Sequence, residues 1–174
     1  FSIHDLLQRY SSELGNTLGN LQNRILPFAR PLHARGADTE LEQALRQHYA
    51  QAEVAVRDAY DDKNPTTALG AIWALLARGN EYVDRRAPWK QAKDPGQRGE
   101  LDITLASLIR QLARQAVLVA PFVPEKAQEL WSQLGAPGAV ADQRYDALPK
   151  LDVTGWQVRK GEPLFLKNCS TCHR

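Results

Sequence analysis

Two polar side chains near the start of the chain could read an unpaired nucleic-acid base. Asn20 and Arg24 are four residues apart, so on a helix they project from the same side. An amide both donates and accepts hydrogen bonds and a guanidinium offers five donors, which suits a base edge and its phosphate. The ordinary polar flank of an amphipathic helix is the competing interpretation, so the pair needs a second signal.

A tryptophan at the end of a later helical stretch supplies that second signal. Pro88 stops the helical pattern and Trp89 follows it directly. A large aromatic ring can stack on an unpaired base while nearby cations hold the backbone, and four basic residues flank this ring: Arg85, Arg86, Lys90 and Lys93. The alternative is that Trp89 anchors the core or a domain interface and that its basic neighbours are only solvated.

Five helical stretches must position these residues. Apolar residues recur every three or four positions over residues 3–28, 41–59, 65–86, 101–119 and 124–134. Asn64 and Pro65 are typical of an N-cap followed by proline at the first helical position. Asn80 shares the apolar side of its stretch, so we expect a buried, structural asparagine. Because no stretch alternates like a strand, the sequence predicts an all-α fold, a five-helix bundle with an irregular C-terminal tail.

The predicted bundle divides into two parts. Residues 1–135 form the helical domain, and residues 136–174 form an extension that packs on the bundle. The extension carries several glycines and prolines, and five apolar residues are its expected docking points: Val153, Trp156, Val158, Leu164 and Phe165.

Bulk composition excludes little. The 22 lysines and arginines nearly balance the 20 aspartates and glutamates, so the net charge of +2 names no partner, although a local basic stripe can still attract phosphates. No apolar run is long enough for a membrane helix, and no signal peptide is recognisable, which predicts a cytoplasmic protein without a membrane partner. The chain starts at Phe1 and contains no methionine, so we expect a segment of a longer polypeptide.

Several motifs together resemble the anticodon-binding domain of methionyl-tRNA synthetases. The likeness spans nearly the whole chain. Its first-helix part is Arg9-Tyr10, Glu13-Leu14, Asn16, Leu18-Gly19-Asn20-Leu21 and Arg24, and its later parts are Asn80, Pro88-Trp89, Ala92-Lys93, Pro121-Phe122, Pro124 and Gly161 through Phe165.

This resemblance implies recognition of the CAU anticodon, chiefly its first base. The matching positions are Asn20, Arg24 and Trp89, and by chemistry we assign stacking to Trp89, the base edge or phosphate to Arg24, and the base edge to Asn20. The flanking basic residues would contact the tRNA backbone. The implied partners are initiator and elongator methionine tRNA and the catalytic domain of the same parent chain.

The sequence shows no catalytic site of its own. The His-Ile-Gly-His-like and Lys-Met-Ser-Lys-Ser-like motifs of this synthetase class are missing, and so is a Gly-rich phosphate loop. We therefore expect a binding module without a cofactor, whose parent is a methionine–tRNA ligase that uses ATP and zinc. The rival interpretations are an anticodon-binding domain of another class Ia synthetase, against which the Gly-Asn-x-x-x-Arg and Pro-Trp pair argues, and a purely structural bundle.

The C-terminal motif suggests a different chemistry. Cys169, Cys172 and His173 have the spacing of a covalent c-type haem site, which would make the chain a helical scaffold with a haem or metal segment. Against haem, the sequence stops at Arg174 and offers no methionine as a sixth ligand. Other interpretations are two chance thiols, part of a zinc site, or a redox-labile disulfide.

Overall fold

Every regular element that the structure describes is helical. The computed structural model describes residues 17–28, 40–159 and 164. The helices are α2 (Asn20–Ile25), α3 (Glu40–Asp61), α4 (Pro65–Arg86), α5 (Pro88–Gln91), α6 (Arg98–Val119) and α7 (Pro124–Gln133). Four short 3-10 turns accompany them: η2 (Leu26–Phe28), η3 (Pro95–Gln97), η4 (Val140–Asp142) and η5 (Tyr145–Lys150).

These elements confirm the predicted all-α class, and α5 is an element that the sequence pattern did not predict. The expected first helix is described only from residue 17 onward. Among the residues described, no helix combines the length and the apolar character needed to cross a membrane.

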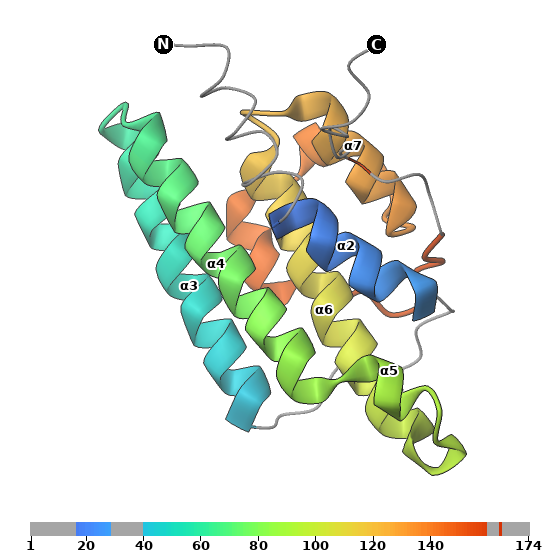
Figure 1. Cartoon of the computed structure of the whole chain (residues 1–174). Coiled ribbons are helices and arrows are strands. Elements are labelled where there is room, and N and C mark those ends of the chain that lie inside the picture. Colours follow the sequence, from blue (N-terminus) through green and yellow to red (C-terminus); the bar gives the residue numbers. More distant parts are fainter. Residues whose placement is uncertain (1–16, 29–39, 160–163, 165–174) are drawn as a thin grey trace, which may run out of the picture.

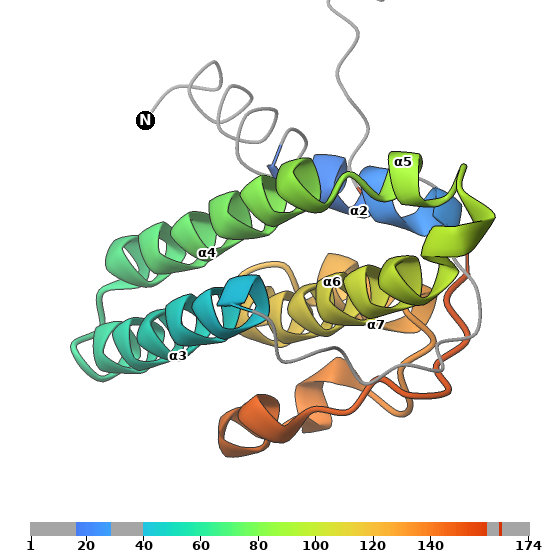
Figure 2. The ribbon, with the colours of Figure 1, turned by 90° about the horizontal axis from the view of Figure 1, so that it is seen from below.

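Helix α6 forms the centre of the bundle (Figure 1). Every residue from Thr104 to Val119 is buried except Arg110, which is half-buried. Helices α3 and α4 lie side by side as an antiparallel pair, and α2, α5 and α7 complete the packing around α6 (Figure 2). Helix α6 thus joins the N-terminal and C-terminal elements in one core.

Local signals fix both ends of α4. At its start, the Asn64 side chain accepts a hydrogen bond from the Thr67 backbone N–H at 3.1 Å, as the predicted N-cap requires. At its end, Ala87 adopts a left-handed conformation with φ of 46°, and its N–H donates to the Val83 carbonyl at 2.9 Å. Pro88 then begins α5, so the predicted stop is confirmed and the chain turns at once into a short helix that carries Trp89.

A glycine lets α2 approach α4 closely. A Cβ atom at Gly79 would lie 3.0 Å from Cδ2 of Leu21. The predicted apolar side of the first helical stretch is confirmed over its described part, because Leu18, just before α2, and Leu21 and Ile25 of α2 are all fully buried. This packing leaves the opposite side of α2, which carries Asn20 and Arg24, directed outward.

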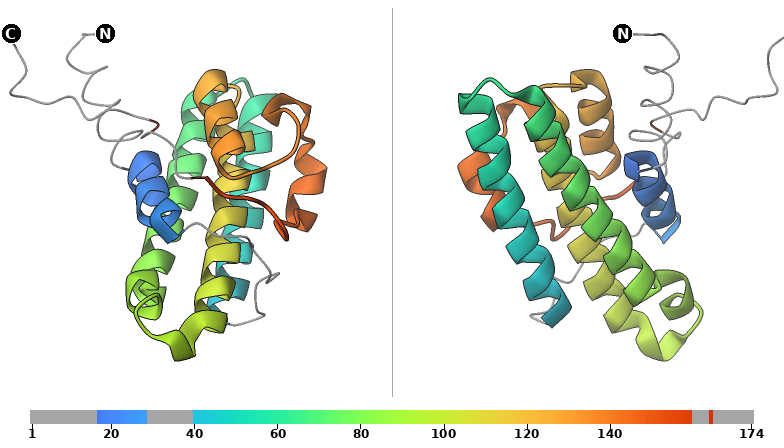
Figure 3. Two further views of the ribbon diagram at one scale, coloured as in Figure 1. Left: turned by 90° about the vertical axis from the view of Figure 1, so that its right-hand side faces the viewer. Right: turned by 60° about the vertical axis from the view of Figure 1, so that its left-hand side comes forward.

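The described residues that follow α7 pack on the bundle. Trp156 packs edge-on against Trp131 with ring centroids 5.5 Å apart, and Val153 and Leu164 are buried. These predicted docking points are confirmed; Val158 is partly buried, and Phe165 lies outside the described residues. Figure 3 shows α2 and η5 on opposite sides of α6.

Candidate nucleic-acid interface

Two of the three predicted base-reading residues meet at the surface between α2 and α5. The guanidinium carbon of Arg24 lies 5.2 Å from the centroid of the Trp89 ring. This is the range of a cation–π contact, in which the ring face attracts the positive charge. Trp89 is partly buried and packs against the core with the rest of its surface open. The fold therefore brings together an aromatic face and a guanidinium that lie far apart in the sequence.

Asp84 of α4 completes this cluster. Its carboxylate forms an ion pair with Arg24, and the two side chains are 66% and 24% exposed, respectively. An ion pair at such a surface contributes little to stability, because water screens the charges. The pair places a carboxylate directly beside the guanidinium that contacts the indole ring. Sequence reasoning missed Asp84 because nothing in the pattern of α4 indicates which of its side chains faces α2.

Asn20 lies one helical turn before Arg24 and is exposed. It shares the outward side of α2 with Arg24, as the spacing predicted. Asn80 is half-buried, and its Nδ2 donates to the Leu76 carbonyl at 3.3 Å, in keeping with the expected structural role. Its Oδ1 atom is buried without a hydrogen-bond partner in the described ranges.

The four residues that we predicted to contact the tRNA backbone differ in their surroundings. Arg86 is mostly buried and donates to Thr104 Oγ1 at 2.9 Å and to Glu100 Oε2 at 2.7 Å, so it links α4 to α6. Arg85 is exposed and pairs with Glu81 within α4. Lys90 and Lys93 are exposed on α5 and just after it. Both lysines are thus exposed cations within four residues of Trp89 in the sequence.

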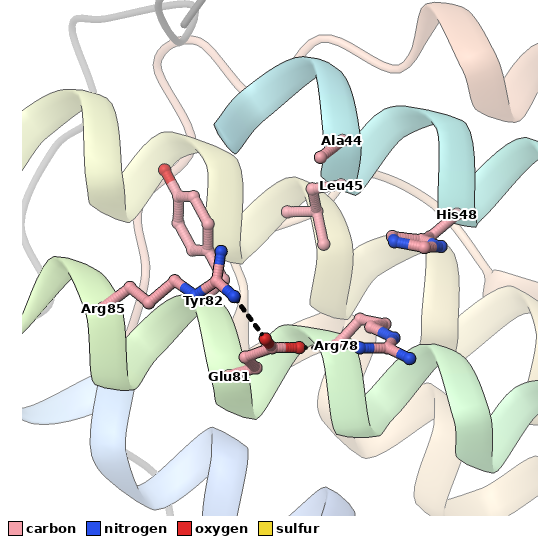
Figure 4. A pocket seen from close by; sticks show the side chains of 7 residues that line it. All are labelled: Ala44, Leu45, His48, Arg78, Glu81, Tyr82 and Arg85. Carbon is pink, nitrogen blue, oxygen red and sulfur yellow. Dashed lines mark hydrogen bonds and ion pairs between the residues drawn. The ribbon is translucent and has the colours of Figure 1, made fainter. Parts of the chain in front are cut away.

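Arg85 faces a different part of the surface from Asp84. It lines a small cleft of about 130 Å³ between α3 and α4, together with Ala44, Leu45, His48, Arg78, Glu81 and Tyr82 (Figure 4). Glu81 accepts from Arg78 at 2.9 Å and from Arg85 at 2.6 Å, and these guanidinium groups lower the pKa of its carboxyl. Since Glu81 balances one of the two positive charges, the cleft is less suited to phosphate than the surface around Trp89.

The structure gives no support for a metal centre in the part of the chain it describes. No group of three or more histidine, cysteine, aspartate or glutamate side chains there could hold a metal ion. The predicted haem or metal ligands Cys169, Cys172 and His173 lie outside the described residues, so that hypothesis stays untested.

The sequence matches a known protein family over most of its length. Residues 32–170 match the family model described as the anticodon binding domain of methionyl tRNA ligase. A methionine–tRNA ligase of Bacillus subtilis is 31% identical over 175 residues, which cover 95% of this chain and 26% of the relative. One from Streptomyces coelicolor is 34% identical over 182 residues, covering 95% and 33%. The chain therefore spans about a quarter to a third of these relatives.

Solved structures agree on the fold. The free form of Mycobacterium tuberculosis methionyl-tRNA synthetase superposes with a TM-score of 0.83 at 24% identity, over 96% of this chain and 35% of that one. The helical arrangement described above is thus shared with a domain inside a longer synthetase.

Proposed function

Because this chain belongs to the family of anticodon-binding domains of methionyl-tRNA ligases, we propose that it binds the anticodon loop of methionine tRNA and reads CAU. Its partners would be initiator and elongator methionine tRNA and the catalytic domain of a parent methionine–tRNA ligase. In that parent, which we place in the cytoplasm, ATP and zinc would serve the catalytic domain.

The contact between Arg24 and Trp89 carries this proposal. An unpaired base needs a flat surface to stack on and a directional donor for its edge, and the two side chains offer these within 5.2 Å of each other. Both are partly accessible, so a base can reach them without unfolding of the bundle.

Each residue then has a distinct role. Trp89 stacks on the first anticodon base, cytosine. Arg24 donates to the edge of that base or to its phosphate, and Asn20, one turn earlier on α2, contacts the base edge. Binding replaces the exposed ion pair of Arg24 with Asp84, which costs little because water already screens it.

Contacts to the tRNA backbone would come chiefly from Lys90 and Lys93, which are exposed next to the stacking ring. Arg85 can contribute only after exchanging its partner Glu81, and Arg86 is engaged with α6. We therefore rank the two lysines above the two arginines as phosphate ligands.

We also propose the domain boundary at residues 135 and 136. Gly135 follows α7 with φ of 75°, where the chain leaves the last long helix. Residues 1–135 would form the helical binding domain, and residues 136–174 the extension that packs on it.

Titration of a CAU stem-loop with wild type and with Trp89→Ala tests the proposal. Loss of one stacked base should weaken binding by about 1–3 kcal/mol at matched salt. Trp73→Ala is the matched control, since Trp73 is also a partly buried tryptophan on the core but lies nearer the start of α4. Equal affinity of wild type and Trp89→Ala for the loop would refute the proposal.

A further inference from the structure

A fully buried glutamine lies on the helix that carries Asn20 and Arg24. Gln22 has 0% of its surface exposed, although its neighbours on the inner side of α2 are apolar. Burying an amide is costly unless its hydrogen bonds are satisfied, so an apolar residue would be the simpler choice at this position. Its presence calls for a specific role.

Both ends of the Gln22 amide have partners on other segments. Its Nε2 donates to Oε1 of Gln133 in α7, and its Oε1 accepts from the backbone N–H of Leu164 at 3.5 Å. One side chain therefore joins α2, α7 and the C-terminal extension. Since hydrogen bonds are directional, these contacts fix the rotation of α2 more narrowly than apolar packing does.

The two partners of Gln22 are themselves held in place by a hydrogen bond or by burial. The Gln133 carbonyl accepts from the Arg159 N–H at 2.7 Å, and Leu164 is 2% exposed in the core. The extension also passes close over Gly135, where a Cβ atom would lie 2.5 Å from the Gln157 carbonyl oxygen. Residues 157–159 thus pack against the end of α7, and Leu164 is held in the core next to Gln22.

We propose that Gln22 is a positioning residue of the anticodon site, which ties α2 to α7 and the C-terminal extension and so sets where Asn20 and Arg24 stand. Gln22 is two residues from each of them, so it points away from their side of the helix. By fixing the inner side of α2, Gln22 also fixes the positions at which Asn20 and Arg24 meet a base. This inference rests on the proposed function and extends it to a residue that touches no RNA.

The test compares the folded chain with Gln22→Leu, which keeps the side-chain size but removes the hydrogen bonds. Affinity for a CAU stem-loop is measured well below the unfolding temperature of each variant, so that loss of stability alone cannot lower it. We expect binding about tenfold weaker, the equivalent of one lost hydrogen bond. Gln133→Leu breaks the same link from α7 and should have the same effect, which keeps the test usable if Gln22→Leu does not fold.

Gln128→Leu provides the matched control. Gln128 Oε1 accepts from the Val140 N–H at 2.8 Å, so this variant breaks an amide link between α7 and η4 without touching α2. It should lower the unfolding temperature and leave RNA affinity unchanged.

A second readout needs no RNA. The indole N–H resonance of Trp89, assigned by its absence in Trp89→Phe, should shift in Gln22→Leu because Arg24 moves over the ring, and should stay in place in Gln128→Leu. Unchanged affinity and an unmoved resonance in both Gln22→Leu and Gln133→Leu would overturn the inference. If wild type itself fails to bind the loop, the proposed function fails, and the resonance still tests the position of α2.

Discussion

Two arginine–aromatic contacts in the described part of the chain have similar geometry but different roles. Arg24 lies over Trp89 at 5.2 Å, and Arg114 lies over Tyr49 at 4.4 Å. The first pair is at the surface between α2 and α5. The second is buried between α3 and α6, where burial lowers the pKa of the Arg114 guanidinium.

Their hydrogen-bond partners explain the difference. Arg114 donates to the backbone carbonyls of Leu148 and Pro149, both at 2.9 Å, so it holds the extension against α6. Arg24 pairs with a mostly exposed carboxylate, which a base or phosphate can replace. A cation–π contact therefore indicates a binding site only where the cation is accessible and its partner exchangeable.

Of the substitutions that test this comparison, removal of the buried Arg114 should have the largest effect, and the effect is on stability. Arg114→Met removes the buried guanidinium that donates to the Leu148 and Pro149 carbonyls, and we expect the free energy of unfolding to fall by about 3 kcal/mol in urea titrations. Arg144→Ala, which removes an exposed arginine paired with Asp146, should leave it nearly unchanged. Comparable losses in the two variants would contradict the structural role of Arg114.

Arg24→Ala should weaken RNA binding and leave the stability of the fold almost unchanged. We expect CAU stem-loop binding to weaken by about 2 kcal/mol, the value of a hydrogen bond to a charged group, with little change in stability. Arg57→Ala is its control, because Arg57 is an exposed, ion-paired arginine on α3. If both substitutions weaken binding equally, only general charge attraction is at work.

The buried pair of Arg114 and Tyr49 should make the stability of the fold depend on pH at high pH. Burial raises the pKa of Tyr49 above the value of about 10 that it has when unfolded. The folded chain then keeps a proton that the unfolded chain releases, so stability is complete below pH 10 and falls as the pH rises further.

Between pH 8 and pH 10.5 we expect this effect to lower the free energy of unfolding of wild type by about 1 kcal/mol, as measured by urea unfolding. Tyr49→Phe should lack this part of the loss. The substitution should cost little at pH 8, since the Tyr49 hydroxyl has no hydrogen-bond partner among the residues described. Identical pH dependence of the two proteins would show that Tyr49 does not contribute.

Asp84→Asn should have the smallest effect. Losing a carboxylate beside the site removes repulsion of phosphates and frees Arg24, so loops of any sequence should bind more tightly, by about 0.5 kcal/mol. Titration of CAU and non-CAU stem-loops at the same salt measures this. Weaker binding of both loops would mean that Asp84 chiefly orients Arg24.

Most of the helices could be predicted from the sequence because their signals are local. The periodic stretch at 65–86 and the Asn64 cap correspond to α4 as the structure has it. Helix α5 was missed, because the left-handed turn at Ala87 that starts it has no glycine to indicate it. Of the site, the shared side of Asn20 and Arg24 followed from their spacing, while the contact with Trp89 depends on how α2 packs.

Tertiary contacts also decide which polar residues are accessible. The pairing of Arg85 with Glu81 could have been expected from their spacing of four residues. The link from Arg86 to Glu100 joins two helices, and the burial of Gln22 depends on α7 and Leu164, so neither follows from a single helix pattern.

The surface formed by Arg24 and Trp89 should read the first anticodon base. This is tested most directly by titrating CAU and GAU stem-loops, which differ only at that base, against wild type and Arg24→Ala at one salt concentration. Wild type should prefer CAU by about tenfold or more, and the variant should lose most of that preference. Equal binding of the two loops by wild type, or an undiminished preference in Arg24→Ala, would contradict this role of Arg24 and Trp89.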